Sequence, residues 1–235
     1  MKNVLIFGGN SDIGFSLGCL FLKSGYRLIL TSKNLNELET KKKFIKDNFY
    51  KECDIYKFDV TEDSVSDLLK KINDNINIII FSNGYLERPE INPEKIMNIN
   101  YLSIVQICEK IIKNEKIDDL KNIIIFSSVA ADRGKKNSST YSSAKAALSS
   151  YANELKHRLR DKKISIMNVK IGYVKTKMTS NLKLPSLLSS TKDNVAKIIF
   201  NSYLKNKENI YAPGYWRLIM FIWKLIPHFI FKILK

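Results

Sequence analysis

The chain has 235 residues, of which 45% are hydrophobic, and it carries a formal charge of +16 at pH 7. This length and hydrophobic content suit a single globular domain with a large buried core. The longest apolar runs fall short of the roughly 18 residues that a membrane-spanning helix needs. The first apolar run, Val4 to Phe7, is too short for the core of a signal peptide.

The strong positive charge is typical of proteins that bind nucleic acid, an anionic membrane surface or a phosphorylated substrate. The lysines are spread along the whole chain, which favours a general compositional bias. We therefore expect no nucleic-acid partner. Two local basic segments, described below, are the exceptions.

The three cysteines, Cys19, Cys53 and Cys108, are widely spaced and form no CxxC pair. This spacing predicts small buried thiols in a reducing cytoplasm, without a disulfide and without a metal site.

Val4 to Phe7 is a continuous apolar run, which predicts a parallel strand buried on both faces. The turn Gly8-Gly9-Asn10-Ser11-Asp12-Ile13-Gly14 follows it and leads into a segment with helical spacing of apolar residues. In such a unit the backbone N–H groups can approach a pyrophosphate. We expect the Asp12 side chain to point away from the phosphates and to cap the following helix. The predicted cofactor contacts in this turn are Gly8, Asn10, Ser11, Ile13 and Gly14.

The second predicted strand, residues 26–31, ends in Thr31-Ser32-Lys33-Asn34. An acidic residue that could hold a ribose 2′-OH is missing here, whereas Ser32 and Lys33 would suit a 2′-phosphate. This favours NADP(H) over NAD(H). A solvated loop lysine at position 33 is the alternative.

The remaining segments continue the alternation of strands and helices. Further strands are expected at 54–58, 76–81, 122–126, 164–171 and 209–212, and helices at 35–48, from Asn92-Pro93, from 139 and at 193–204. The pattern predicts a single-domain, doubly wound α/β fold of Rossmann type, with a mostly parallel sheet and helices on both faces. We expect this domain at 1–212, a C-terminal amphipathic helical tail at 213–235, and a substrate lid at 178–191.

Tyr141 and Lys145 are four residues apart, so on a helix they share one face. An ammonium beside a phenol favours the phenolate, which makes Tyr141 a candidate general acid for protonating a carbonyl oxygen. Ser128, at the end of the predicted strand 122–126, could polarise the same carbonyl. By itself a Tyr and a Lys at this spacing are more often a core residue and a solvated one. The glycine turn and Ser128 favour the catalytic interpretation.

Together these motifs resemble the short-chain dehydrogenase/reductase family over residues 1–212. The resemblance implies that Ser128, Tyr141 and Lys145 are catalytic, and that Asn100 helps to hold a water that relays protons to the lysine. It also implies that Tyr141 and Lys145 contact the cofactor. The remaining cofactor contacts that it implies are Asp59, Val60, Asn83, Gly84, Gly172, Val174 and Thr176.

A narrower resemblance is to the decaprenylphosphoryl-keto-pentose reductases. It is carried by the glycine turn, by Ile99-Asn100-Tyr101, by Thr176-Lys177-Met178 and by the segment 211–216. It implies reduction of a keto group on a phosphorylated or polyprenyl-phosphate-linked sugar in cell-envelope polysaccharide synthesis. The family resemblance also implies a homo-oligomer. The alternatives are a reductase of 3-oxoacyl or other lipid ketones and a non-enzymatic NADP-binding regulator.

Two basic segments bear on the substrate. The loop Asp132-Arg133-Gly134-Lys135-Lys136-Asn137 lies between Ser128 and Tyr141, where its cations would suit a phosphate, or would simply be solvated. In the tail, a cationic stripe lies beside apolar and tryptophan side chains; its members are Arg217, Lys224, His228, Lys232 and Lys235. This pattern fits a helix in an anionic membrane interface, with Pro227 bending or splitting it, or a helix packed on the domain or on a sister subunit. We expect a cytoplasmic protein, peripheral on the inner face of the membrane in the first case.

Overall fold

The computed structural model describes residues 2–72, 74–87, 89–113, 119–134 and 138–231. Its centre is a seven-stranded sheet in which the strand order is β3-β2-β1-β4-β5-β6-β9 and all pairs are parallel. The strands are β1 (Asn3–Phe7), β2 (Arg27–Ser32), β3 (Asp54–Lys57), β4 (Ile78–Phe81), β5 (Asn122–Ser128), β6 (Ser165–Ile171) and β9 (Asn209–Ala212). This confirms the predicted doubly wound fold.

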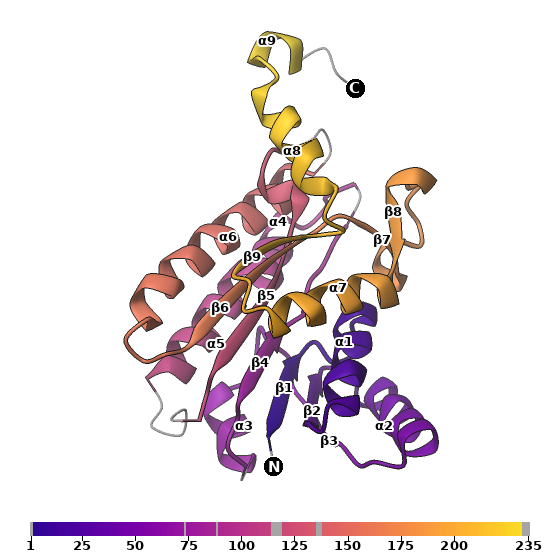
Figure 1. Ribbon diagram of the computed structural model, residues 1–235, viewed down its shortest axis with the longest axis vertical. Coiled ribbons are helices and arrows are strands. Elements are labelled where there is room, and N and C mark those ends of the chain that lie inside the picture. Colours follow the sequence, from indigo (N-terminus) through magenta and orange to yellow (C-terminus); the bar gives the residue numbers. More distant parts are fainter. Residues whose placement is uncertain (1, 73, 88, 114–118, 135–137, 232–235) are drawn as a thin grey trace.

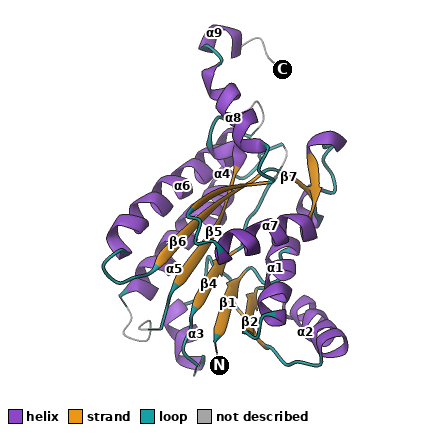
Figure 2. Cartoon of the chain, in the orientation of Figure 1, coloured by secondary structure: helices purple, strands orange, loops and turns teal. Residues whose placement is uncertain are grey.

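Helices cover both faces of the sheet (Figures 1 and 2). One layer contains α1 (Asp12–Lys23), α2 (Leu35–Phe49) and α7 (Lys192–Leu204), and the other contains α3 (Val65–Lys71), α5 (Ser103–Ile112) and α6 (Ser139–Leu159). The short α4 (Pro93–Met97) runs through a π-helical turn, η1 (Asn98–Leu102), into α5.

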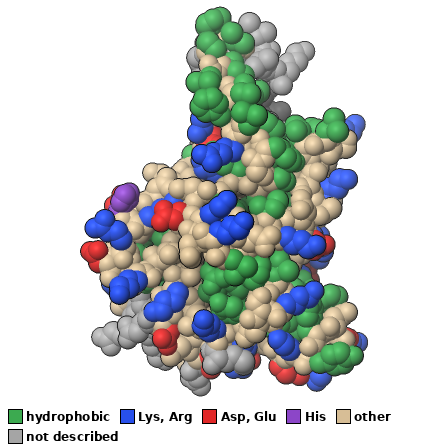
Figure 3. All heavy atoms as spheres, viewed as in Figure 1, with side chains coloured by type: hydrophobic (Ala, Val, Ile, Leu, Met, Phe, Trp, Pro, Cys, Tyr) green, Lys and Arg blue, Asp and Glu red, His purple; other side chains and the backbone are tan. Residues whose placement is uncertain are grey.

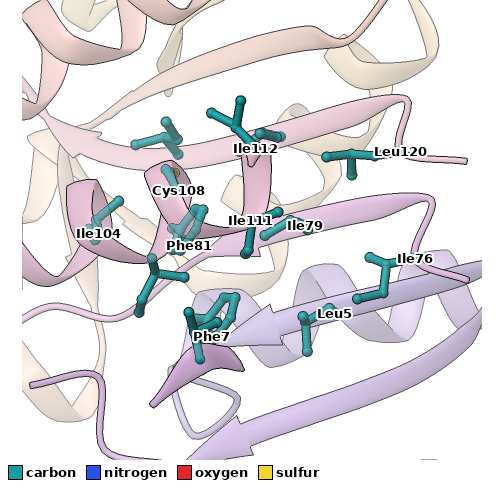
Figure 4. Packing of buried hydrophobic residues seen from close by; sticks show 14 of the residues in the cluster. Leu5, Phe7, Ile76, Ile79, Phe81, Ile104, Cys108, Ile111, Ile112 and Leu120 are labelled. Atoms are coloured by element: carbon teal, nitrogen blue, oxygen red, sulfur yellow. The ribbon is translucent and has the colours of Figure 1, made fainter. Parts of the chain in front are cut away.

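Alternate residues of each central strand enter the two halves of the core. Leu5, Phe7 and Phe81 pack against α5 (Figure 4), and the Phe7 and Phe81 rings stack at 5.1 Å. Val4 and Ile6 face the opposite layer with α1 and α7. Both faces are therefore buried, which explains why the strands show no alternation of polar and apolar residues.

The expected lid at 178–191 has more structure than the sequence indicated. It contains short 3₁₀ turns and a strand, β8 (Ser189–Thr191), which pairs with β7 (Tyr173–Lys175) in a separate two-stranded parallel sheet. Neither strand was predicted, because three residues carry too little periodicity to be recognised.

The cysteines are free thiols, as predicted; Cys53 and Cys108 are buried, but Cys19 is only half-buried. Among the helices described, none is long and apolar enough to cross a membrane.

The tail forms two helices, α8 (Trp216–Leu225) and α9 (His228–Phe231), which project from one end of the molecule (Figure 1). The break between them confirms the split expected at Pro227. Trp216 and Met220 are each only 2% exposed, and they form a small core with Val129. One face of α8 is therefore packed against the domain.

Candidate active site

A pocket of about 840 Å³ opens at the carboxyl edge of the sheet. In doubly wound folds this edge is where ligands bind. The predicted site residues that line it are Gly8, Asn10, Ser11, Ile13, Ser32, Lys33, Asp59, Val60, Asn83, Gly84, Ser128, Tyr141, Lys145, Gly172, Val174 and Thr176. The two exceptions are Gly14 and Asn100. The fold thus brings together residues that are far apart in sequence.

Ser128 is the last residue of β5, and Tyr141 and Lys145 lie in the first two turns of α6. A second serine fixes this helix against the strand: the Ser127 hydroxyl donates to the Lys145 carbonyl at 3.1 Å and lies 2.6 Å from the Ser149 hydroxyl. Both contacts are buried. The extension of β5 to Ser128, beyond the predicted end at Phe126, places both serines in the strand.

Lys145 is 3% exposed, and its Nζ donates to the Phe126 carbonyl at 3.0 Å. Burial lowers the pKa of this ammonium from 10.5 to about 7. Its Nζ lies 5.9 Å from the centre of the Tyr141 ring. Burial thus opposes the positive charge on which the predicted effect of Lys145 on the phenol depends.

The glycine turn differs from the prediction in one respect. Ser11, not Asp12, caps α1, since its hydroxyl accepts a hydrogen bond from the Gly14 amide at 3.2 Å. The Asp12 carboxylate accepts from the Lys177 amide at 2.7 Å, which fastens the turn to the segment after β7. A Cβ on Gly14 would lie 2.2 Å from the Ser82 hydroxyl, so only a glycine lets the start of α1 pack this closely on Ser82.

Gly8 has φ +78°, and a Cβ there would lie 2.6 Å from the Asn83 amide nitrogen. Only glycine therefore fits between β1 and the end of β4, which leaves the backbone of the turn bare on the pocket side. Open backbone at the start of a helix is the arrangement that accepts a phosphate group.

The end of β2 is ordered by Asn10, whose amide donates to the Ser32 hydroxyl and to the Asn34 carbonyl, both at 2.9 Å. Lys33 is exposed at the rim of the pocket. Burial opposes ionisation of Asp59, but hydrogen bonds from Thr61 and the charge of Lys33 lower the pKa of Asp59 overall. Lys33 therefore lies close enough to the Asp59 carboxylate for its charge to lower the pKa of that group.

Asn100 is completely buried in the π-helical turn and does not line the pocket. Its amide nitrogen donates to the carbonyls of Tyr85 and Ile96, and its side-chain oxygen accepts from the Tyr85 amide. Its side chain thus holds the backbone after β4. The water-holding role implied by the family resemblance stays a prediction.

Sequence reasoning missed two pocket residues in the tail, Trp216 and Met220. Trp216 packs edge-on against Tyr173, with ring centres 5.0 Å apart. For Trp216 the structure favours packing on the domain, one of the two alternatives expected for the tail. A helix pattern alone does not show which face meets the domain.

In the basic loop after Ser128, Arg133 lines the pocket. The Arg133 guanidinium donates to the carbonyls of Trp223 and Ile226 at 2.6 and 2.7 Å, so it contacts the end of α8. The Asp132 carboxylate binds Lys170, Lys224 and the Tyr211 hydroxyl. Lys135 and Lys136 lie outside the described residues.

This fold and pocket define a dinucleotide-binding class of α/β protein. The short chain dehydrogenase family model matches residues 2–186, and the chain belongs to that family.

Three relatives show between 23% and 26% sequence identity to the chain. The chain is 26% identical to a dehydrogenase/reductase SDR family protein 7-like of Drosophila melanogaster, over 77% of this chain and 59% of that one. It is 23% identical to an uncharacterized oxidoreductase of Mycobacterium tuberculosis, over 97% of this chain and 95% of that protein. It is also 23% identical to a 3-oxoacyl-[acyl-carrier-protein] reductase of Buchnera aphidicola, over 91% and 93%.

Among solved structures, a short chain dehydrogenase from Burkholderia cenocepacia in complex with NADP superposes with a TM-score of 0.78 at 15% identity, covering 97% of this chain and all of that one. A short-chain dehydrogenase from Sphingobium yanoikuyae in complex with NADPH gives 0.78 at 16%, covering 97% of each chain. Such distant likeness supports the fold alone.

Proposed function

We propose that the protein reduces a ketone to an alcohol with NADPH. The observation that carries this proposal is the convergence of Ser128, Tyr141 and Lys145 with the glycine turn in one pocket. Several structural neighbours were solved in complex with NADP, NADPH or 5-hydroxy-NADP, which supports the choice of cofactor. The family membership argues against a non-enzymatic regulator.

The residues present fit a dinucleotide. The turn around Gly8 offers bare backbone for the pyrophosphate, because a Cβ there has no room. Ser32 and Lys33 would bind the 2′-phosphate, Asp59 and Val60 the adenine end, and Asn83, Gly84, Gly172, Val174 and Thr176 the rest of the molecule. The cofactor supplies the hydride.

In the proposed reaction Ser128 orients the substrate carbonyl by donating a hydrogen bond to its oxygen. Tyr141 protonates that oxygen as charge develops on it. Lys145 holds the ribose and, through its charge, eases the loss of the tyrosine proton. Asn100 does not line the pocket; it contributes by holding the backbone of Tyr85, a pocket residue, through two hydrogen bonds.

For the substrate we propose a phosphorylated or polyprenyl-phosphate-linked keto sugar of cell-envelope polysaccharide synthesis. The support is the lining of the pocket. Lys177, whose Nζ lies 3.8 Å from the Glu37 carboxylate, and Lys183 are exposed cations suited to a phosphate. Trp216 and Met220 contribute apolar surface to the same pocket. A 3-oxoacyl ketone is the second candidate, because two relatives of that name align with much of the chain.

The decisive experiment for the substrate is a screen of NADPH oxidation with keto-sugar phosphates and 3-oxoacyl thioesters side by side. Activity with the keto sugars supports the first proposal. Activity with the thioesters alone overturns it while leaving ketone reduction intact.

We also propose that the tail binds a membrane surface on the cytoplasmic side. Its outward residues are exposed and apolar, and Figure 3 shows hydrophobic side chains covering the projecting segment; they are Leu218, Phe221, Ile222, Leu225, Phe229 and Ile230. Arg217 is exposed beside them, whereas Lys224 pairs with Asp132 at 3.1 Å. The other members of the predicted stripe, the His228 side chain, Lys232 and Lys235, lie outside what the structure describes.

A further inference from the structure

The helix that carries Tyr141 is capped by a side chain from another loop. Ser138 precedes α6, but its side chain does not cap the helix. Glu90 takes this part: its carboxylate oxygens accept hydrogen bonds from the Thr140 and Tyr141 amides, each at 3.0 Å. The Ser139 hydroxyl donates to the same carboxylate at 3.4 Å. These are the amides that an N-cap side chain ordinarily satisfies.

The charge of Glu90 suits this place. Burial opposes its ionisation, but the hydrogen bonds from Tyr141, Thr140 and Ser139 lower the pKa of Glu90 overall. A carboxylate at the N-terminus of a helix is also stabilised by the helix dipole, here of a helix 21 residues long. The group is therefore charged, and bound to the helix start, at neutral pH.

Tyr141 needs such a contact more than Lys145 does. The first turn of a helix lacks internal acceptors for its amides, so it frays most easily, and Tyr141 lies in that turn. Lys145, one turn further, is held by the contacts of Ser127 and Phe126. Of the carboxylates in the described part of the chain, Glu90 is the one seen bonded to the Tyr141 amide.

Glu90 belongs to a loop that is itself well fixed. Glu87 folds it, accepting from the amides of Ile91 and Asn92 at 3.1 and 3.0 Å and from the Tyr85 hydroxyl at 2.8 Å. The buried Asn100 holds the Tyr85 backbone at the other end. Hydrogen bonds thus hold the loop backbone on both sides of Glu90.

We propose that Glu90 is a positioning residue, which sets the Tyr141 hydroxyl relative to Ser128 and Lys145. The role in turnover rests on the proposed ketone reduction. Removal of the carboxylate would let the first turn of α6 shift while the rest of the helix stays in place. A misplacement of about 1 Å can lower a rate by about 100-fold.

Ser64 offers a control for the loss of a helix cap away from the site. Its hydroxyl accepts from the Asp67 amide at 3.4 Å at the start of α3, and no residue of α3 lines the pocket. We expect Glu90→Ala to lower kcat by about 10- to 100-fold, with KM changed by less than about threefold. Glu90→Gln keeps the size and one acceptor oxygen but replaces the other with an NH2 donor, so it should recover part of the loss. Ser64→Ala should keep kcat within about threefold of wild type. Equal losses in Glu90→Ala and Ser64→Ala, or no recovery in Glu90→Gln, would overturn the proposal.

A second readout does not depend on turnover. Amide hydrogen exchange of a peptide spanning residues 138–146 should be at least about tenfold faster in Glu90→Ala than in wild type, and unchanged in Ser64→Ala. Unchanged exchange in Glu90→Ala contradicts the proposal, whatever substrate the enzyme uses. If wild type reduces no ketone but exchange rises as expected, the proposed reaction fails and the positioning of Tyr141 by Glu90 stands. Should Glu90→Ala fail to fold, the comparison of Glu90→Gln with Ser64→Ala decides by both readouts in the same way.

Discussion

Trp216 packs so closely on Gly172 that a Cβ at position 172 would lie 2.0 Å from the indole Nε1. Gly172 follows β6 in the wall of the pocket, and Trp216 begins α8. This contact makes the first turn of the tail part of the pocket wall. Removal of the tail would therefore also remove the buried Trp216 and expose the domain surface around Gly172.

Gly172→Ala should therefore destabilise the fold by about 1–3 kcal/mol, because overpacking forces the indole to shift. Thermal unfolding monitored by tryptophan fluorescence measures the effect. Gly214→Ala is the matched control, since a Cβ there meets nothing within 4 Å. Equal melting temperatures for Gly172→Ala and Gly214→Ala would show that the contact is unimportant.

The buried Lys145 should make stability depend on pH. Its pKa is lowered to about 7 in the folded protein, so between pH 7 and about 10 the unfolded chain binds more protons and stability rises with pH. The contribution is at most about 1.4 kcal/mol per pH unit. Because burial raises the pKa of Cys19 to about 11, the range below pH 8.5 is the cleanest.

The test is the difference in unfolding free energy between wild type and Lys145→Met, followed from pH 7 to 8.5. We expect the wild type to gain stability relative to the variant as the pH rises. A difference that stays constant over this range would mean that Lys145 keeps an ordinary pKa in the folded protein.

Cofactor preference depends on the rim of the pocket at Ser32 and Lys33. Loss of a charged hydrogen-bond donor typically costs about 1.5–3 kcal/mol, so Lys33→Asp should weaken NADPH binding by at least about tenfold. NADH binding should change little. Fluorescence titration of both nucleotides measures this, and tighter binding of NADH than of NADPH by wild type would refute the 2′-phosphate assignment.

Membrane binding should depend on the outer face of the tail. Phe221 and Leu225 are 62% and 66% exposed, so Phe221→Glu with Leu225→Glu should abolish co-sedimentation with anionic liposomes without lowering the melting temperature. A chain ending at Ala212 is a poorer probe, because it also lacks the buried Trp216. Unchanged sedimentation of the double variant would exclude the membrane proposal. A dimer that dissociates in this variant would assign the face to a second copy of the chain instead.

Much of the fold was predictable because its information is local. The apolar run before Gly8 and the turn itself specify β1 and the start of α1, and both lie within 15 residues of sequence. Tyr141 and Lys145 were recognisable for the same reason, since one helical turn links them.

The features that were missed depend on contacts between distant segments. Glu90 meets Tyr141 across 51 residues of sequence, and Arg133 meets Trp223 across 90. Neither residue shows a local pattern, since a glutamate in a loop and an arginine in a basic turn are ordinarily solvated. The burial of Trp216 likewise depends on Gly172, and periodicity in the tail does not show this contact.

The proposed reaction depends on the Tyr141 hydroxyl as the proton donor in ketone reduction. Tyr141→Phe keeps the ring and removes only this hydroxyl. With any ketone that the wild type accepts, NADPH oxidation by the variant should fall by at least about 100-fold, while the dissociation constant for NADPH stays within about threefold. Turnover by Tyr141→Phe equal to that of wild type would contradict the account.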